Sequence, residues 1–428
     1  MPGMQMPMTS STEASMQMDM PMSATTLIEA QLNHASSGTS IEPASTPVPM
    51  LMSSHGGWML MLHGSAFITD TQQSGPRGAD KLFSTNWIMP MAQHQLGPGQ
   101  LTLRAMFSLE PATVTDRQYP LLFQQGETAF GKPIIDGQHP HNFFMEVAAL
   151  YDIHLGERSL LSFYAAPIGD PAIGPSAYPH RLSASEDPLA ALGHHQQDST
   201  HIAYNVLTAG LTFNSVRIEA SGFHGAEPSE QRWGFQPSPN GHAIDSYSTR
   251  ITFSPRPNWT AQYSVAHITS PETLYPNEDQ QRQTASIMYN RPLHNGNWSS
   301  TLIWGRTKSL TAQSNPLIAQ SKENSYLLES LIRFRTRNYA WARIENAGRS
   351  NELLLTPGSP LPPNFEEFPI GHVAAYSFGY DRDFRLIPHL LTAPGAQFTT
   401  YTTPSALIPT YGSHPFGAAL FIRFRISQ

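Results

Sequence analysis

Apolar and polar side chains alternate along the stretch from Asn142 to Leu155. Alternation with a period of two residues predicts a β-strand, here about as long as a tilted membrane-spanning strand. Residues 156–159, Gly-Glu-Arg-Ser, then predict a tight turn into a returning strand. The polar face carries every charge, and the apolar face consists of Phe143, Met145, Val147, Ala149, Tyr151, Ile153 and Leu155.

The rest of the chain repeats this unit of long loop, alternating strand, tight turn and returning strand. Short turns follow one end of each hairpin and long loops follow the other, which is typical of outer-membrane barrels. We therefore predict an all-β fold: an antiparallel transmembrane β-barrel of about 16 strands with short periplasmic turns and long outer loops. The predicted strands are residues 58–72, 82–96, 101–110, 142–155, 160–168, 201–213, 216–225, 246–254, 259–269, 283–291, 298–307, 325–335, 339–346, 371–380, 390–401 and 416–427.

The alternative architecture is a soluble or secreted β-sandwich or propeller. A propeller would show a blade repeat, which the chain lacks, and a sandwich needs a polar outer face, whereas the apolar face is the cleaner one here. Strands 201–213 and 298–307 alternate poorly, so the sequence does not assign their faces.

Charged side chains on the polar faces are expected to line the lumen. They admit two interpretations: a salt-bridged, solvated interior, or a pore with an anion preference, since arginine outnumbers the acids. The lumen-lining candidates are Arg104, Glu146, Asp152, Arg217, Glu219, Arg250, Glu329, Arg333, Arg335, Arg343, Glu345, Arg423 and Arg425.

Residues 1–57 differ in composition from the barrel at 58–428. They predict a Met-rich, largely disordered periplasmic segment, with a short helix from about Thr26 to His34 and Gly38 beyond its end. Residues 45–49 read as an extended linker. The first positive side chain is Arg77 and no apolar run follows Met1, so a barrel would require a signal peptide that has been removed.

Charge and composition indicate which partners the protein is expected to have. A net charge of −7 gives no reason to expect nucleic acid as a partner. Cysteine is absent, which is expected for an outer-membrane or periplasmic protein, with chance as the alternative explanation. The chain has no apolar run of about 18 residues and hence no predicted transmembrane helix. The expected partners are the lipid bilayer of the outer membrane and a periplasmic protein.

Histidines cluster in the outer loops and at the strand ends beside them. Neutral imidazoles with nearby carboxylates can bind a borderline metal ion, although loop histidines are also ordinary polar surface. The candidate ligands are His139, His141, His194, His195 and His201, and the nearby acids are Asp136, Glu186, Asp187, Asp198, Glu227 and Glu272. No Ser-His-Asp spacing or phosphate loop is evident, so we expect no enzyme; an outer-membrane hydrolase using His141 or His201 is the weakest alternative.

The amino-terminal methionines follow a Met-x-Met pattern. Thioethers are soft ligands that favour Cu(I) or Ag(I), so the segment could capture copper; the alternative is a low-complexity tail or a wrongly assigned start. The candidate ligands are Met4, Met6, Met8, Met16, Met18, Met20 and Met22.

Two resemblances follow from these motifs. A Met-rich segment before a barrel resembles the outer-membrane copper-resistance proteins of Gram-negative bacteria. Residues 136–146 (Asp-Gly-Gln-His-Pro-His-Asn-Phe-Phe-Met-Glu) and 197–201 (Gln-Asp-Ser-Thr-His), with residues 37–47 and 58–64, resemble an uncharacterised family of bacterial secreted or outer-membrane proteins. That family implies no activity, and it carries Arg and Asp where this chain has Gly137 and Asn142, so a carboxylate role at Asn142 is not expected.

The leading hypothesis is an outer-membrane barrel that binds or passes a small solute, with copper or another metal ion favoured. The alternative from another class is a structural or partner-binding barrel, for example a sheath for a periplasmic electron carrier. Its lumen would be filled by that partner or by the chain's own loop 111–140.

Overall fold

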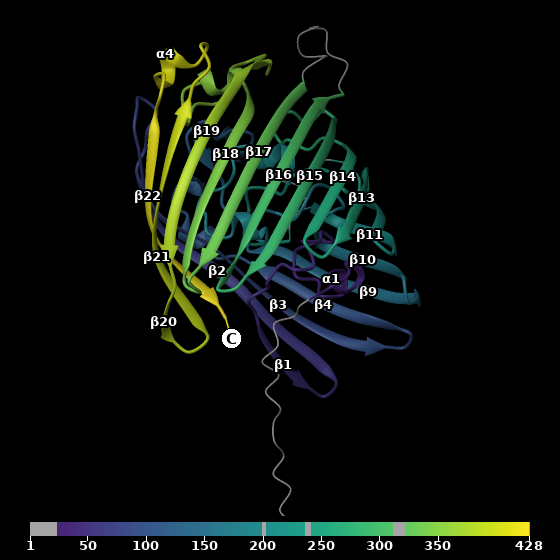
Figure 1. Cartoon of the computed structure of the whole chain (residues 1–428). Coiled ribbons are helices and arrows are strands. Elements are labelled where there is room, and N and C mark those ends of the chain that lie inside the picture. Colours follow the sequence, from purple (N-terminus) through teal and green to yellow (C-terminus); the bar gives the residue numbers. More distant parts are fainter. Residues whose placement is uncertain (1–23, 199–202, 236–240, 311–321, 428) are drawn as a thin grey trace, which may run out of the picture.

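Sixteen strands form a closed antiparallel β-barrel in the computed structural model, which describes residues 24–198, 203–235, 241–310 and 322–427 (Figure 1). The barrel strands are β2 (Trp58–Gln73), β3 (Lys81–Leu96), β4 (Gly99–Phe107), β9 (Phe144–Gly156), β10 (Ser159–Gly169), β11 (Ala203–Phe213), β12 (Val216–His224), β13 (Ser246–Arg256), β14 (Trp259–Ile268), β15 (Gln280–Leu293), β16 (Gly296–Ser309), β17 (Lys322–Phe334), β18 (Asn338–Ser350), β19 (Pro369–Arg382), β21 (Leu390–Thr402) and β22 (Phe416–Ile426). These are the sixteen strands predicted from alternation, so that prediction is confirmed.

Short helices and strands accompany the sixteen barrel strands. Strand β1 forms a hairpin with β2, which the sequence did not lead us to expect, and β20 pairs with β21. The short elements are α1 (Leu27–Leu32), β1 (Leu51–His55), α2 (Glu110–Thr113), β5 (Tyr119–Pro120), β6 (Thr128–Ala129), β7 (Lys132–Pro133), β8 (Gly137–Gln138), α3 (His194–Gln197), β20 (Phe384–Ile387) and α4 (Ile408–Tyr411). Among the described residues, no helix is long and apolar enough to cross a membrane.

Closure joins the first barrel strand to the last. β2 pairs with β22 over nine residue pairs, from Ser65 with Arg425 to Gln73 with Gly417. The remaining part of β2 pairs with β1 instead. We call the end with the short hairpins the turn end and the opposite end the loop end; the described carboxyl terminus lies at the turn end (Figure 1).

The outward face is apolar along most strands. β11 and β16, which the sequence left unassigned, turn Leu207, Leu211 and Leu302 outward, each about half exposed. At the turn end Trp259, Tyr289 and Trp298 contact one another in a row across β14, β15 and β16. An apolar band bordered by aromatic side chains is what a lipid-facing barrel surface requires.

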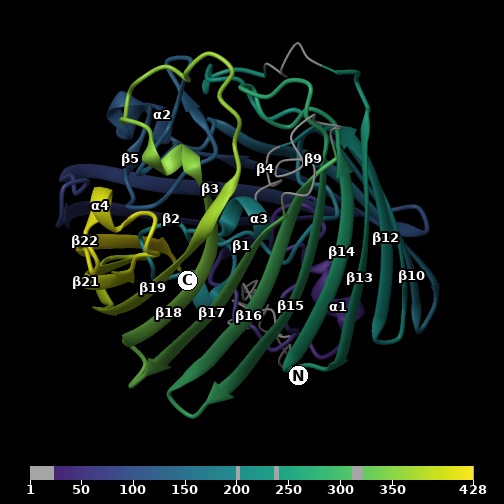
Figure 2. The same cartoon turned by 90° about the horizontal axis from the view of Figure 1, so that it is seen from above.

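The lumen is filled by the chain itself. In the view from above, α1 and α3 lie inside the ring of strands (Figure 2). Residues 24–50, which we call the plug segment, enter at the turn end, and residues 108–143 and 170–198, the plug loops, fold in from the loop end. Loop apolar side chains such as Leu122, Phe123 and Leu192 are fully buried there.

The plug segment corrects the expectation of a largely disordered stretch over residues 1–57. Residues 24–57 adopt a defined structure, and α1 begins directly after its cap Thr26, whose hydroxyl accepts a hydrogen bond from Glu29 N–H. The segment is ordered because lumen side chains form hydrogen bonds with its polar groups. Gln31 donates to Asp152 at 3.0 Å, and Arg104 donates to the carbonyls of His34 and Ser36. Residues 1–23 lie outside the described residues.

Two face assignments made from alternation are wrong. Met145 was placed on the apolar outer face, but a β-bulge opposite Met106 and Phe107 makes it an extra residue and turns it into the lumen, where it is buried. Arg335 was placed in the lumen, but β17 ends at Phe334 and Arg335 is exposed in the following turn with a positive φ of 49°.

Candidate metal centre

Three histidines from the two plug loops meet inside the loop end of the barrel. His139 follows the short strand β8, and His194 and His195 open the single helical turn α3, which packs against β15, β16 and β17. One ring nitrogen of each histidine can be chosen so that the three atoms all lie within 4.8 Å of one another. Residues more than fifty positions apart in the chain thus converge on one point.

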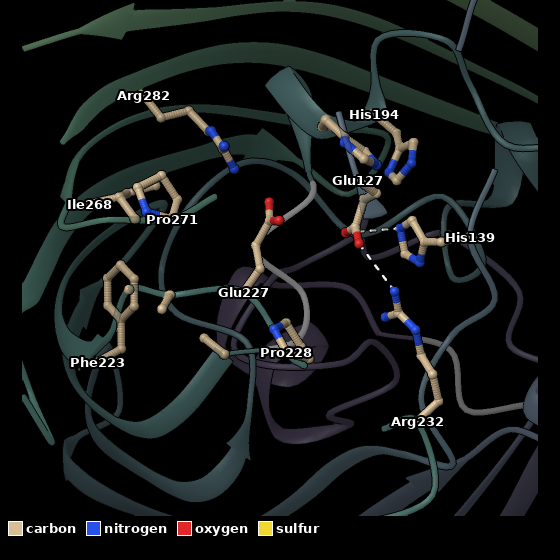
Figure 3. Close-up of a pocket in the computed structure, with 14 residues that line it drawn as sticks. Glu127, His139, His194, Phe223, Glu227, Pro228, Arg232, Ile268, Pro271 and Arg282 are labelled. Carbon is tan, nitrogen blue, oxygen red and sulfur yellow. Dashed lines mark hydrogen bonds and ion pairs between the residues drawn. The ribbon is translucent and has the colours of Figure 1, made fainter. Parts of the chain in front are cut away.

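Glu127 and Arg232 complete the surroundings of this histidine cluster (Figure 3). His139 Nε2 lies 3.2 Å from Glu127 Oε1, and Arg232 donates to Glu127 Oε2 at 3.1 Å. Arg232 also donates to Asn142 Oδ1 at 3.0 Å, which locks the loop that carries His139. The guanidinium therefore holds both the carboxylate and the histidine loop in place.

The cluster favours neutral imidazoles. Burial, followed by the charge of Arg232 and by His195, holds the pKa of His139 well below its usual value. Burial, with Arg282 and Arg349, lowers the pKa of His195 to about 3. A neutral imidazole has the lone pair that a metal ligand needs, so these rings are ready to bind a metal ion near neutral pH.

The tautomer of His139 is compatible with the same role. Its Nδ1 lies 3.0 Å from the carbonyl oxygen of Pro140, so an Nδ1–H can donate there and leave the Nε2 lone pair facing Glu127. Burial raises the pKa of Glu127, although Arg232 opposes this effect. A partner that fixes one ring nitrogen orients the other toward a metal.

A small cavity of about 30 Å³ lies beside the histidines, with Glu227, Arg282 and Phe223 on its far side. The Glu227 carboxylate points into it (Figure 3), and burial, together with Glu127 and Glu272, holds its pKa well above the usual value. The space is of the order of one water molecule, which also suits a single metal ion.

The donor set fits a borderline transition-metal ion. Three imidazoles and one carboxylate are ligands that Zn²⁺, Cu²⁺ and Ni²⁺ accept. Bonds of 2.0–2.1 Å in a tetrahedron place ligand atoms about 3.4 Å apart, so any ring nitrogens that stand farther apart than this would close in on binding. Rotation of the imidazole rings can supply such a shift.

The other predicted ligands that the structure describes are not part of this group. His141 contacts Glu110 instead, with Nδ1 3.0 Å from a carboxylate oxygen. Asp198 is 3.9 Å from His194 Nδ1 but pairs with Arg181 at 2.8 Å. His201 and the seven methionines Met4, Met6, Met8, Met16, Met18, Met20 and Met22 lie outside the described residues.

The remaining acids named with the histidines have other partners. Glu186 pairs with Arg423 and Arg425, and Asp187 pairs with Arg343. Asp136 accepts hydrogen bonds from Phe123 N–H and Tyr411 O–H, and Glu272 accepts one from Gln280.

The lumen charges lie where alternation placed them, with the exception of Arg335 already described. Arg333 is half-buried above the ring of Tyr339. The buried arginines among those that suggested an anion-preferring pore are held in ion pairs, for example Arg104 with Glu146 at 2.7 Å. The buried members are Arg104, Glu146, Asp152, Arg217, Glu219, Arg250, Glu329, Arg343, Glu345, Arg423 and Arg425.

Sequence reasoning missed Glu127 and Arg232. Each stands in an irregular loop without periodicity, so no local pattern distinguishes it from an ordinary surface charge. Only the folding of the loops into the lumen brings them beside the histidines. Glu227, by contrast, was among the acids named from the sequence and does line the cavity.

Comparison with known proteins shows the fold. No protein-family model matches the chain, and no curated protein matches it. An anion-selective porin from Comamonas acidovorans aligns with a TM-score of 0.51 at 9% identity, covering 86% of this chain and 100% of that chain. OmpF of Salmonella typhi, solved with daunomycin, gives 0.50 at 9% identity over 88% and 100%. OprB of Pseudomonas putida gives 0.50 at 9% identity over 86% and 94%. The chain shares the barrel fold of these outer-membrane porins.

Proposed function

We propose that the protein is a plugged outer-membrane barrel that handles metal ions, copper first, and binds them at His139, His194 and His195. The observation that carries this proposal is the meeting of three imidazoles and the Glu127 carboxylate inside the lumen. Porin-like architecture supports a role in the binding or passage of a small solute, with no enzymatic step.

Residence in the outer membrane is part of the proposal. A barrel with large apolar side chains facing outward, such as Leu211, Ile218 and Leu302, would aggregate in water but is stable in lipid. By the rule that outer-membrane barrels keep short turns on the periplasmic side, the turn end and both termini face the periplasm and the histidine cluster faces outward.

Copper is favoured on ligand chemistry. Among divalent first-row ions, Cu²⁺ binds nitrogen and oxygen sites most tightly, and imidazole suits it well. The amino-terminal Met-x-Met segment would complement this centre by taking up Cu(I), with a periplasmic protein as its exchange partner.

Metal binding by the purified full-length protein in detergent tests the proposal. We expect close to one Cu²⁺ or Zn²⁺ per chain, quantified by inductively coupled plasma mass spectrometry after gel filtration. A variant with His139→Ala, His194→Ala and His195→Ala should lose this ion. Substitution of the exposed His154 and His294 should leave it bound. Equal metal content in the triple variant would overturn the metal centre.

The filled lumen supports a second candidate, a structural or partner-binding barrel. Both candidates, the metal-binding barrel and the structural barrel, have a closed lumen, and a conductance measurement in a planar bilayer distinguishes a closed lumen from an open pore. A steady conductance of porin size would contradict a plugged barrel, and a closed barrel that binds no metal would favour the structural role.

A further inference from the structure

Methionines gather in one region of the lumen wall, along β1, β2, β3, β4 and β9. Of the seventeen methionines in the chain, nine follow residue 23. Eight of these nine form a single cluster, and the ninth, Met288, lies in β15. We call this set the methionine cluster: the buried members are Met50, Met61, Met89, Met91, Met106 and Met145, and Met52 and Met59 are partly buried against them.

The strand register places these side chains in rows across the wall. Met61 on β2 lies directly opposite Met52 on β1 and Met91 on β3. Directly opposed residues have Cβ atoms about 4.5–5.5 Å apart, so three thioethers stand side by side. In the next inward-facing row, His63 lies opposite Met89.

Two histidines stand within this cluster. His180, from a plug loop, has Nε2 3.3 Å from the sulfur of Met106. His63 is 5% exposed, its Nε2 is buried without a hydrogen-bond partner, and its ring centroid is 5.9 Å from that of His180. A buried ring nitrogen without a hydrogen-bond partner is destabilising, and a bound metal ion would satisfy it.

Apolar packing is the alternative explanation of the cluster, because methionine fills irregular gaps well. The other four apolar clusters of the described residues contain no methionine and use Leu, Ile, Val, Ala and aromatic side chains. Gap filling alone does not account for this segregation. A requirement for sulfur at one place in the barrel does.

A cavity of about 310 Å³ gives access to the cluster. Its lining includes Met50, Met52, His63, Trp87 and His180. It lies at the seam where β2 exchanges β22 for β1 as its neighbour, since Ser65, Arg425 and Ser427 line it as well. Arg104 lies opposite Met91 and is neutralised by Glu146 through two hydrogen bonds. Arg333 and Arg425 line the cavity, and Arg425 pairs with Glu186.

We propose that the methionine cluster with His63 and His180 is a binding site for a soft monovalent metal ion, Cu(I) or Ag(I), entered from this turn-end cavity. Thioether sulfur and neutral imidazole are uncharged ligands that such ions prefer, and no proton has to leave the thioethers on binding. The site is separate from the histidine cluster at the loop end and does not rest on it.

The test uses the full-length protein in which Met4, Met6, Met8, Met16, Met18, Met20 and Met22 are replaced by Leu, so that the tail cannot bind silver. Ag(I) is titrated against a competing chelator, and X-ray absorption reports its ligands. We expect close to one Ag(I) per chain with sulfur neighbours.

Met61→Leu, Met89→Leu and Met91→Leu together should weaken Ag(I) binding by at least about tenfold. Leucine conserves volume, so the barrel should stay folded, as heat-modifiable gel migration will show. Met288→Leu is the matched control, because Met288 is buried in the wall outside the cluster. His63→Leu should also weaken Ag(I) binding without lowering the stability of the metal-free protein.

Unchanged Ag(I) affinity in the triple methionine variant would overturn the proposal and leave the cluster as apolar packing. Loss of Ag(I) when His139, His194 and His195 are replaced would also overturn it, because the ion would then belong to the loop-end centre. Retention of Ag(I) in that histidine variant, with loss of its Cu²⁺ or Zn²⁺, separates the two proposals.

Discussion

At the scale of single residues, Glu146 joins the wall to the plug. It accepts hydrogen bonds from Arg104 Nε and Nη2, from Tyr164 O–H and from Gly38 N–H, all within 2.8 Å. Glu146→Leu would leave Arg104 as a buried charge without its carboxylate, and removing one partner of a buried pair costs about 3–5 kcal/mol. We expect a loss of unfolding free energy of that size in urea titrations.

Ala149→Leu on the outward face of the same strand is the control, since its side chain is exposed to the surroundings of the barrel. It should leave the urea midpoint unchanged. A Glu146→Leu protein as stable as the wild type would show that the wall and plug are not joined through this carboxylate.

The histidine cluster predicts a pH effect on stability. The folded pKa of His195 is lowered to about 3, below an ordinary value of about 6.5. The unfolded chain therefore takes up this proton first as pH falls. The stability contributed by neutral His195 is complete above pH 6.5 and is lost between pH 6.5 and about 3. The metal-free wild type should therefore become progressively less stable than His195→Gln over this window.

Thermal unfolding of both proteins from pH 7 to 4 measures that difference, with exposed His154→Gln as the comparison. A constant difference between wild type and His195→Gln across the range would show that the imidazole is solvated in the folded protein.

At the scale of elements, Gly38 determines how closely the plug segment packs in the lumen. Its φ is +59°, and a Cβ there would lie 2.3 Å from Cβ of Asp170. Gly38→Ala should displace the segment and cost about 1–3 kcal/mol beyond backbone strain. Gly56 has nearly the same φ, +57°, and open space around it, so Gly56→Ala controls for strain.

Amide hydrogen exchange of residues 34–46 reads out this displacement by mass spectrometry. Exchange should accelerate in Gly38→Ala and stay slow in Gly56→Ala. Equal exchange in the two variants would mean that the plug segment tolerates a side chain at its contact with Asp170.

The elements also show what sequence could and could not predict. Alternation predicts strands such as β9, because one face of the strand contacts lipid and the other contacts polar groups. The plug segment and plug loops lack a period, since each side chain meets a different neighbour. Loop 111–140 was expected in the lumen only under the alternative of a structural barrel, and the lumen positions of residues 24–50 and 170–198 were not predicted. The bulge at Met145 reverses a face through one extra residue, and the histidine centre needed Glu127 and Arg232 from irregular loops.

At the scale of the whole molecule, the outer surface should behave as a lipid-facing one. Leu302 on β16 is 53% exposed. In water an exposed Leu→Arg change is nearly neutral, whereas at the middle of a bilayer it costs about 2–4 kcal/mol. We expect Leu302→Arg to lose that amount in folding titrations with lipid vesicles.

Leu386→Arg is the matched control, because Leu386 is 74% exposed on β20 at the turn end, where the cost falls to about 0–1 kcal/mol. Fractionation should recover the wild type with the outer membrane and show heat-modifiable migration. A soluble, detergent-free monomer would contradict the membrane assignment.

The nine-pair closure between β2 and β22 has a consequence for the order of folding. Every other pairing between barrel strands joins chain neighbours, but this one waits for the last strand to be made. Contacts so distant along the chain form late, because the entropy of closing the loop must be met first. The plug segment is made first, and two of its wall partners, Arg104 and Asp152, belong to early strands. The cylinder can therefore assemble around its own contents, so that nothing needs to be threaded in after the wall is sealed.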